Sequence, residues 1–218
     1  MNNNCIYLSY FLDDRTPLYG GAKGIFVTPD RSIAQGDTAN TKRLTMHNHS
    51  GTHIDFPNHF FDDGKKSDAY DASFWVFSHP FFLEKNVAEA ELISFTKSEL
   101  QSIPKQTDFL IVKTGFGKFR MEEKYWQDNP GFAPSTAEQL RVQCPLIRIL
   151  GMDLISLTSF RHREIGREAH RKFLGDNNIL LIEDMDLSQL TKSPKQIICL
   201  PLLVKNFDGA PVTIIANI

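Results

Sequence analysis

The sequence predicts a mixed α/β fold in one domain, and three observations support this prediction. Short apolar runs that are typical of buried strands recur along the chain, most clearly at residues 109–114. Between some of these runs, apolar residues follow helical spacing, most clearly at residues 159–174. The chain has 218 residues, of which 41% are hydrophobic, so it can bury a sizeable core. Strands that alternate with a few helices indicate a mixed sheet in a single domain over residues 1–218.

Each expected strand is a short run of apolar or β-branched residues bounded by turn residues. These strands are expected within residues 20–28 and at residues 6–12, 43–56, 109–114, 146–151, 179–183, 196–203 and 211–217. A first helix is expected at residues 134–140, because Ser135 can cap it and Glu138 lies three residues further on. A second helix is expected at residues 159–174.

The balance of charge indicates which partners the protein binds. Its 24 Lys and Arg against 26 Asp and Glu give a net charge of −2, which creates no global field for nucleic acid or anionic lipid. The longest apolar runs, near residues 197–204, contain Pro201 and are far shorter than the ~20 residues of a transmembrane helix. We therefore expect a small-molecule substrate, with neither a nucleic-acid nor a membrane partner.

The cysteines favour a reducing compartment. Cys5, Cys144 and Cys199 are three in number and widely spaced, so they form neither a C-x-x-C metal knuckle nor an even disulfide framework. Residues 1–12 lack the basic n-region of a secretory signal. The expected location is cytoplasmic.

The segment at residues 47–59 is the richest in reactive side chains. It holds four of the seven histidines and one aspartate in the run HNHSGTHIDFPNH. His49, His53, Asp55 and His59 occupy odd positions, so an extended backbone would project them from one face. Imidazole and carboxylate suit borderline divalent ions such as Zn²⁺ or Mn²⁺. The segment predicts the floor of a metal site; the alternative is a polar loop with incidental histidines.

The spacing within this segment limits how many ions the side chains can share. His53 and Asp55 lie ~7 Å apart at Cα in a strand, so their side chains can converge on one ion. His49 and His53 would lie ~13 Å apart in a straight strand, which is too far for one ion. Gly51 lies midway and can bend the chain. Either the chain bends there and all three residues share a metal, or His49 serves a second ion.

Pro57 sets the expected role of His59. A proline removes a backbone donor and confines the following segment to a strand end or edge, so His59 is expected to emerge into a cleft. That position suits a proton-transfer residue better than a buried ligand.

Residues 49–59, HSGTHIDFPNH, resemble the H-x-G-T-H-x-D-x-P-x-H signature of the metal-dependent cyclase-like hydrolases, which include kynurenine formamidase and isatin hydrolase. Further similarity lies at residues 8–9, 16–21, 113–116, 151–153, 200–202 and 209–212. The resemblance implies a swivelling β/β/α fold with one or two divalent ions. It also implies a homodimer or larger assembly, expected here as a homodimer or homotetramer, in which loops near the site are shared between subunits.

His170 is the first of two distant ligand candidates. Ile165, Ala169 and Phe173 define a buried helical stripe, and His170 lies beside it. Because helical side chains lean toward the amino terminus, His170 is expected to reach over Gly166, where a missing side chain leaves room for an ion. By itself such a residue is more typical of an ordinary boundary histidine. The resemblance assigns it as a metal ligand.

Glu183 is the second distant candidate. It directly follows the buried run at residues 179–182, so it emerges at a strand end in a partly apolar environment and needs a cation. A strand-end glutamate can also simply face water, and Asp184 and Asp186 compete for the same role. The resemblance favours Glu183.

Other signals are weaker or depart from the family pattern. The basic residues at 161–172 alternate with acidic ones at helix-pair spacing, which indicates a solvated helix face. Residues 156–158 read Ser-Leu-Thr where many relatives carry Ser-x-Asp, and Thr213 stands where an arginine is frequent. These departures leave the metal site intact and put the usual substrate in doubt.

The expected activity is hydrolysis of a C–N bond in a small, aromatic amide, formamide or cyclic amide. Metal-activated water would attack, and His59 would carry the proton to the leaving group. The alternatives are a metal-dependent lyase or cyclase, a lactone hydrolase, and a metal-binding relative without turnover.

Overall fold

The computed structural model describes residues 5–218. Residues 1–4, the start of the segment that is expected to lack a secretory signal, lie outside this range. The strands are β1 Cys5–Tyr7, β2 Ile25–Arg31, β3 Thr41–Met46, β4 His53–Asp55, β5 Val76–Phe77, β6 Pro80–Glu84, β7 Leu92–Ile93, β8 Phe109–Lys113, β9 Gly131–Phe132, β10 Ile149–Met152, β11 Leu180–Glu183, β12 Gln196–Pro201 and β13 Gly209–Asn217. The helices are α1 Lys97–Ser102, α2 Lys124–Gln127, α3 Ser135–Gln143 and α4 Arg163–Arg171.

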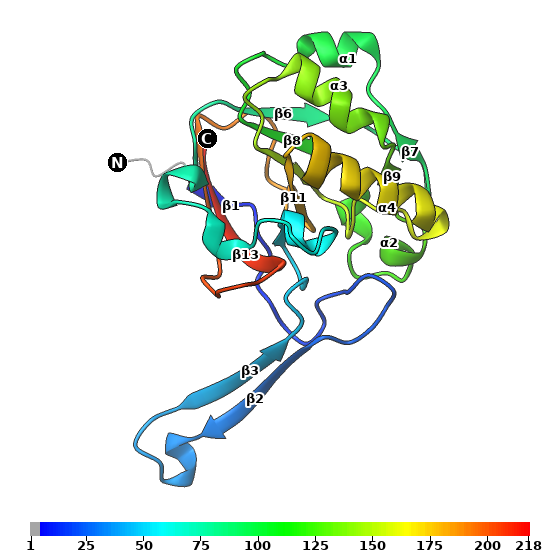
Figure 1. Cartoon of the computed structure of the whole chain (residues 1–218). Coiled ribbons are helices and arrows are strands. Elements are labelled where there is room, and N and C mark those ends of the chain that lie inside the picture. The colour runs from blue at the N-terminus through cyan, green and yellow to red at the C-terminus, as the bar shows by residue number, and fades with distance from the viewer. Residues whose placement is uncertain (1–4) are drawn as a thin grey trace.

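One large mixed sheet organises the chain, as predicted (Figure 1). Its strand order is β5-β12-β13-β4-β11-β10-β8-β6, with β1 paired to β13. The strands from β11 to β6 run parallel, whereas β4 is antiparallel to both of its neighbours, β11 and β13. The three-residue β4 therefore joins the parallel and antiparallel halves of the sheet.

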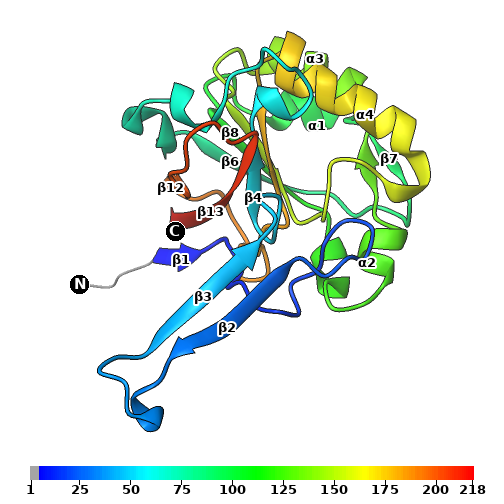
Figure 2. The same ribbon diagram turned by 60° about the horizontal axis from the view of Figure 1, so that its bottom comes forward.

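The core lies at β8, β10 and β11 of the parallel half, because these strands are buried on both faces, whereas the edge strand β6 is mostly half-buried. Phe109 to Val112 on β8 are fully buried, as are all residues of β10 and β11. Strands that are covered on both sides need continuous apolar runs, which is why the sequence pattern revealed them. Helices α1, α3 and α4 lie together on one side of this half (Figure 2).

The strand expected at residues 43–56 is wrong as a single element, because the chain divides it. Residues up to Met46 belong to β3, which pairs with β2 in an exposed hairpin that projects from the body (Figures 1 and 2). The chain then turns at Gly51, whose φ of +63° lies in the left-handed region, before β4 begins. The metal motif therefore spans a bend and a very short central strand.

The strand expected at residues 6–12 ends at Tyr7, and that expected at 146–151 begins only at Ile149. Both expected helices also differ in detail. Ser135 does not cap α3: Pro134 holds the N-cap position without a side-chain hydrogen bond, and Ser135 is already helical. The helix expected at residues 159–174 is a composite, with a 3₁₀ turn Phe160–His162, then α4, then a π turn Lys172–Asp176. Within residues 5–218, every helix is too short or too polar to span a bilayer.

Candidate metal centre

The central strand and its neighbour present the inner residues of the site. His53 and Asp55 are two residues apart on β4, so their side chains share a face. Glu183, the last residue of β11, pairs directly opposite His53 in the antiparallel ladder. Cross-strand partners project to the same side. All three side chains are nearly inaccessible to solvent.

His170 completes this inner group from α4. Its Nε2 lies 3.3 Å from Glu183 Oε1 and 3.6 Å from Asp55 Oδ2. The reason expected for its placement is wrong, because the space over Gly166 is not vacant. A Cβ at Gly166 would lie 2.4 Å from the Thr158 side chain, which fills that space. Gly166 thus allows close packing of Thr158, and the ion-sized gap lies on the other side of the imidazole.

The spacing of the inner atoms distinguishes a metal site from a set of hydrogen bonds. His53 Nε2 lies 3.4 Å from Glu183 Oε2 and 3.6 Å from Asp55 Oδ1. Ion-paired hydrogen bonds are shorter, ~2.7–2.9 Å. Four ligands around an ion at ~2.0–2.2 Å stand ~3.3–3.6 Å from one another. Each histidine–carboxylate contact is therefore longer than an ion-paired hydrogen bond and falls in the range expected between two ligands of one ion, and ligand atoms of His53, Asp55 and Glu183 all lie within 4.8 Å of one another.

The outer ring nitrogens of both inner histidines are already engaged. His53 Nδ1 donates to the Gly51 carbonyl at 2.8 Å, and His170 Nδ1 donates to the Gly166 carbonyl at 2.9 Å. In the neutral tautomer that these bonds select, each Nε2 carries a lone pair directed at the carboxylates. A lone pair that faces a carboxylate needs a cation between them, and backbone support of the outer nitrogen is usual for a metal-binding histidine.

The electrostatics of the pocket favour positive charge. Burial lowers the pKa of His170, but Asp55 and Glu183 outweigh it and raise that pKa to about 10. Burial and Asp55 raise the pKa of Glu183, while His170 and His53 lower it more strongly, to about 2. Without a metal the carboxylates hold protons on the imidazoles, and a divalent ion can replace those protons.

His49 differs from the inner histidines because both of its nitrogens make short contacts. The bend at Gly51 brings His49 Nδ1 to 2.8 Å from Asp55 Oδ1, while its Nε2 lies 2.9 Å from Asp208 Oδ2. Burial opposes protonation, but Asp208 and Asp55 raise the pKa of His49 to about 10. The His49 ring thus lies between two carboxylates, an environment that favours its protonated form. Its assignment as a metal ligand stays a prediction.

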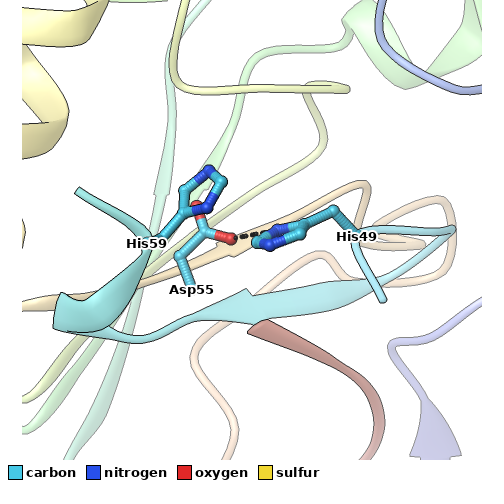
Figure 3. A group of neighbouring side chains, drawn as sticks. All are labelled: His49, Asp55 and His59. Carbon is cyan, nitrogen blue, oxygen red and sulfur yellow. Dashed lines mark hydrogen bonds and ion pairs between the residues drawn. The ribbon is translucent and has the colours of Figure 1, made fainter. Parts of the chain in front are cut away.

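His59 lies in the 3₁₀ turn Pro57–His59 and is the most exposed of these histidines. Its Nδ1 lies 2.9 Å from Asp208 Oδ2, and its ring lies 4.0 Å from the ring of His49. Figure 3 shows His49, Asp55 and His59 together; ligand atoms of these three lie within 4.8 Å of one another. Atoms of His53, Asp55 and Glu183 meet the same limit. Asp55 belongs to both groups, which is the arrangement that a second ion would need.

Asp208 is the site residue that sequence reasoning missed. Its carboxylate accepts from His49 and His59, and also from Asn48 Nδ2 at 2.7 Å. It immediately precedes β13, whose Gly209 pairs with Asp55 in the sheet. The similarity to the family at residues 209–212 is the one sequence signal near this position. It begins directly after Asp208 and so does not include the aspartate itself.

The two carboxylates that the sequence offers as alternatives to Glu183 bind other partners. Asp184 binds the Arg120 guanidinium through both oxygens, at 2.8 and 2.7 Å, and accepts from the Tyr125 hydroxyl at 2.7 Å. Asp186 accepts from Ser188. Among the three carboxylates of this run, only Glu183 contacts the histidines.

The segment that departs from the family pattern contacts Glu183 and His170. Glu183 Oε1 accepts from the Leu157 backbone N–H at 2.6 Å and from Ser156 Oγ at 3.2 Å. Thr158 Oγ1 lies 3.1 Å from His170 Nδ1. Thr213 instead lines a separate groove beside β12, away from the histidines. The Ser-Leu-Thr run therefore retains a positioning role.

A cavity of about 470 Å³ opens above these residues. Its walls include His49, His53, His59, His170 and Glu183, together with other side chains such as Tyr19, Phe60, Arg163 and Arg167. Phe60 stacks on the His170 ring with centroids 4.6 Å apart. The cavity has room for a small molecule with one aromatic ring.

Comparison with known proteins agrees with this geometry. Residues 6–158, more than half of the chain, match the family model for Cyclase. The chain belongs to the Cyclase family. Kynurenine formamidase from Bacillus cereus is 30% identical over 183 residues, covering 83% of this chain and 81% of the relative. Cyclase-like protein 2 from Oryza sativa is 28% identical over 207 residues, covering 90% and 72%.

Solved structures place this Cyclase-family chain in the same fold. Isatin hydrolase A from Labrenzia aggregata, bound to benzyl benzoate, superposes with a TM-score of 0.81 at 20% identity, covering 97% of this chain and 92% of that one. The mixed α/β fold predicted from the sequence is confirmed. The recognition of the cyclase-like hydrolases from residues 49–59 is confirmed as well.

Proposed function

We propose that this protein is a metal-dependent hydrolase that cleaves the C–N bond of a small aromatic amide, formamide or cyclic amide. One observation carries the proposal: His53, Asp55, His170 and Glu183 converge beneath a cavity, and each histidine Nε2 lies 3.3–3.6 Å from an oxygen of both carboxylates. The kynurenine formamidase and isatin hydrolase relatives support the choice of bond.

The inner side chains would hold a Zn²⁺ or Mn²⁺ ion. Such an ion lowers the pKa of its bound water and polarises a carbonyl when it is in place. Asp55 and Glu183 supply the negative charge that retains it, and the backbone carbonyls that orient His53 and His170 keep their free nitrogens aimed inward. A second ion would use Asp55 and His49, and it would replace the proton that Asp55 and Asp208 favour on the His49 ring.

His59 is suited to move protons at the cavity wall. When its Nδ1 donates to Asp208, its Nε2 is left as the basic atom. This nitrogen can accept a proton during attack and return it to the leaving nitrogen. Asp208 fixes the orientation of the ring, as a carboxylate does behind a catalytic histidine.

The test begins with protein stripped of metal by a chelator and reloaded with Zn²⁺ or Mn²⁺. Turnover is measured on N-formylkynurenine, formanilide, isatin and an aromatic lactone. We expect one formate released per formanilide cleaved, only in the reloaded samples. Equal turnover in the stripped and reloaded protein would overturn metal dependence. Preference for the lactone would favour the alternative hydrolase, and metal uptake with no turnover would indicate a non-catalytic relative.

We also propose that the chain forms a homodimer or homotetramer. The hairpin β2–β3 is exposed along nearly its whole length, and an isolated two-stranded hairpin is only marginally stable in water. Exposed apolar residues line the groove at its base, among them Phe11, Leu44 and Leu203. Light scattering on the native protein and on Leu44→Glu tests this: we expect a dimer or tetramer that the substitution dissociates, and a monomeric parent would refute it.

A reducing, cytoplasmic location is proposed on the cysteines. Cys5 is exposed, and Cys5, Cys144 and Cys199 are all free thiols in the described part of the chain. Thiol titration of native protein should find each of them reduced, and a disulfide would contradict the proposal.

A further inference from the structure

The cavity wall on α4 carries two arginines that the proposed chemistry does not use. Arg163 and Arg167 both line the cavity that contains His170. The three residues are spaced i, i+4 and i+7, so they lie along one side of the helix. At 1.5 Å rise per residue, Arg167 lies ~4.5 Å and Arg163 ~10.5 Å along the axis from His170. The arginines therefore form a row that leads from the cavity mouth to the candidate metal centre.

The charge of Arg163 is unpaired by any carboxylate among residues 5–218. Its guanidinium lies 5.5 Å from the Phe160 ring, which in turn contacts Tyr19 and Trp126 edge-on. Arg167 pairs only with Glu164, whose side chain is 85% exposed. The two carboxylates in the cavity wall are already engaged, Glu183 by the histidines and Asp184 by Arg120. The mouth is therefore positively charged.

The Tyr19 hydroxyl provides an independent sign of a missing ligand. Tyr19 lines the same cavity, and its buried hydroxyl has no hydrogen-bond partner of good geometry within residues 5–218. Burying a hydroxyl without a good partner raises the free energy of the folded protein, so such groups are rare and often mark a ligand site. Tyr19 and Arg163 share this wall: burial raises the pKa of the phenol, while the charge of Arg163 and a weak hydrogen bond with its guanidinium oppose that rise.

We propose that Tyr19, Arg163 and Arg167 recognise an anionic group of the substrate. This inference rests on the proposed amide hydrolysis and deepens it: the substrate is an aryl amide that carries a carboxylate on the side of the ring away from the scissile bond. Two guanidinium groups and a hydroxyl donor match the oxygens of a carboxylate. The aromatic ring then spans the distance between the arginine row and the inner histidines.

The kinetic test compares two isosteric probes, 4-formamidobenzoate and the neutral 4-formamidobenzamide. In R163Q/R167Q we expect KM for the benzoate to rise at least ~10-fold, while kcat/KM for the benzamide stays within ~2-fold of the parent. Y19F should raise KM for the benzoate by a smaller factor. The matched control is K172Q, which removes a charge paired with Asp176 outside the cavity. A KM for the benzoate that is unchanged in R163Q/R167Q, or equally raised in K172Q, would overturn the proposal.

A binding test keeps the proposal independent of turnover. Calorimetry measures the Kd of purified protein for 4-carbamoylbenzoate and for benzene-1,4-dicarboxamide. We expect the parent to prefer the anion at least ~10-fold and R163Q/R167Q to bind both ligands equally. If the parent binds the two equally, or the double variant keeps the preference, the anion is not recognised by this row. If the preference is present but neither formamide is cleaved, the proposed hydrolysis fails and the recognition site stands.

Discussion

Glu183 and Asp184 are consecutive buried carboxylates with opposite environments. Asp184 meets a fixed cation, Arg120, at 2.7 and 2.8 Å, and that guanidinium also lies over the Tyr10 ring at 3.9 Å. Glu183 faces two imidazole nitrogens at 3.3 and 3.4 Å, beyond the range of a good ionic hydrogen bond. One network is closed by the protein's own charges, and the other leaves a gap of ionic size.

The difference shows how a structural charge network can be told from a site that binds an ion. Charged side chains that already lie at hydrogen-bond distance from their partners need no further ligand, and they stabilise the fold. Carboxylates and lone pairs that converge without touching lower their free energy when a cation enters. The substitutions below separate these two roles.

The largest effect is expected from Asp55→Ala. Asp55 contributes oxygens toward His53, His170 and His49, so its loss opens both candidate ion sites. We expect loss of bound metal and a fall of turnover to the uncatalysed level, checked by elemental analysis and formate release. His53→Ala should behave alike. A variant that keeps stoichiometric zinc or manganese would show that β4 is not the metal strand.

His59→Ala should separate proton transfer from metal binding. Removing a general acid or base typically lowers the rate ~10²–10⁴-fold. We expect that loss in kcat with nearly full metal content, and a pH–rate profile without its near-neutral limb. Asp208→Asn should give a smaller loss of the same kind, since Asp208 orients the His59 ring but does not itself transfer the proton. Unchanged turnover would remove His59 from the mechanism, whereas lost metal would make it a ligand.

Breaking the closed network should affect stability instead of chemistry. Arg120→Leu leaves the buried Asp184 carboxylate unpaired, and breaking a buried pair costs ~3–5 kcal/mol. We expect the free energy of unfolding in urea to fall by about that amount, while folded protein keeps its metal content. Loss of metal at unchanged stability would place Arg120 in the site.

The smallest effect concerns the pH dependence of stability in metal-free protein. The pKa of His170 is raised to about 10 from 6.5, so its stabilising contribution is complete below pH 6.5 and is lost as the pH rises toward 10. The pKa of Glu183 is lowered to about 2 from 4.5, so its contribution is complete above pH 4.5 and is lost toward pH 2.

The melting temperature of the metal-free protein should therefore be highest between pH 4.5 and 6.5, and it should fall by a few degrees by pH 9. Metal-loaded protein should decline less on the alkaline side, because its ligands are neutral imidazoles. If the melting temperatures of the metal-free and metal-loaded proteins fall by the same amount at alkaline pH, His170 does not bind the ion.

The sequence predicted the parts of the site that follow from local periodicity. Alternation placed His53 and Asp55 on one face, and the buried run before Glu183 located that residue at a strand end. It could not reveal Asp208, since nothing local shows that the turn before β13 lies against His49. The packing of Thr158 over Gly166 is likewise a tertiary contact that no local pattern shows. The prediction of one strand over residues 43–56 was wrong because Gly51 turns the backbone.

The position of β4 has a consequence for the order of assembly. Its three residues are held between β11 and β13, which are separated from it by more than a hundred residues of chain. During synthesis the histidine motif emerges before both flanking strands, which follow it by more than a hundred residues. Pairing over such separations closes long loops and is slow. We expect the ion to enter last, so that nascent chains carry their histidines unmetallated until β13 has docked.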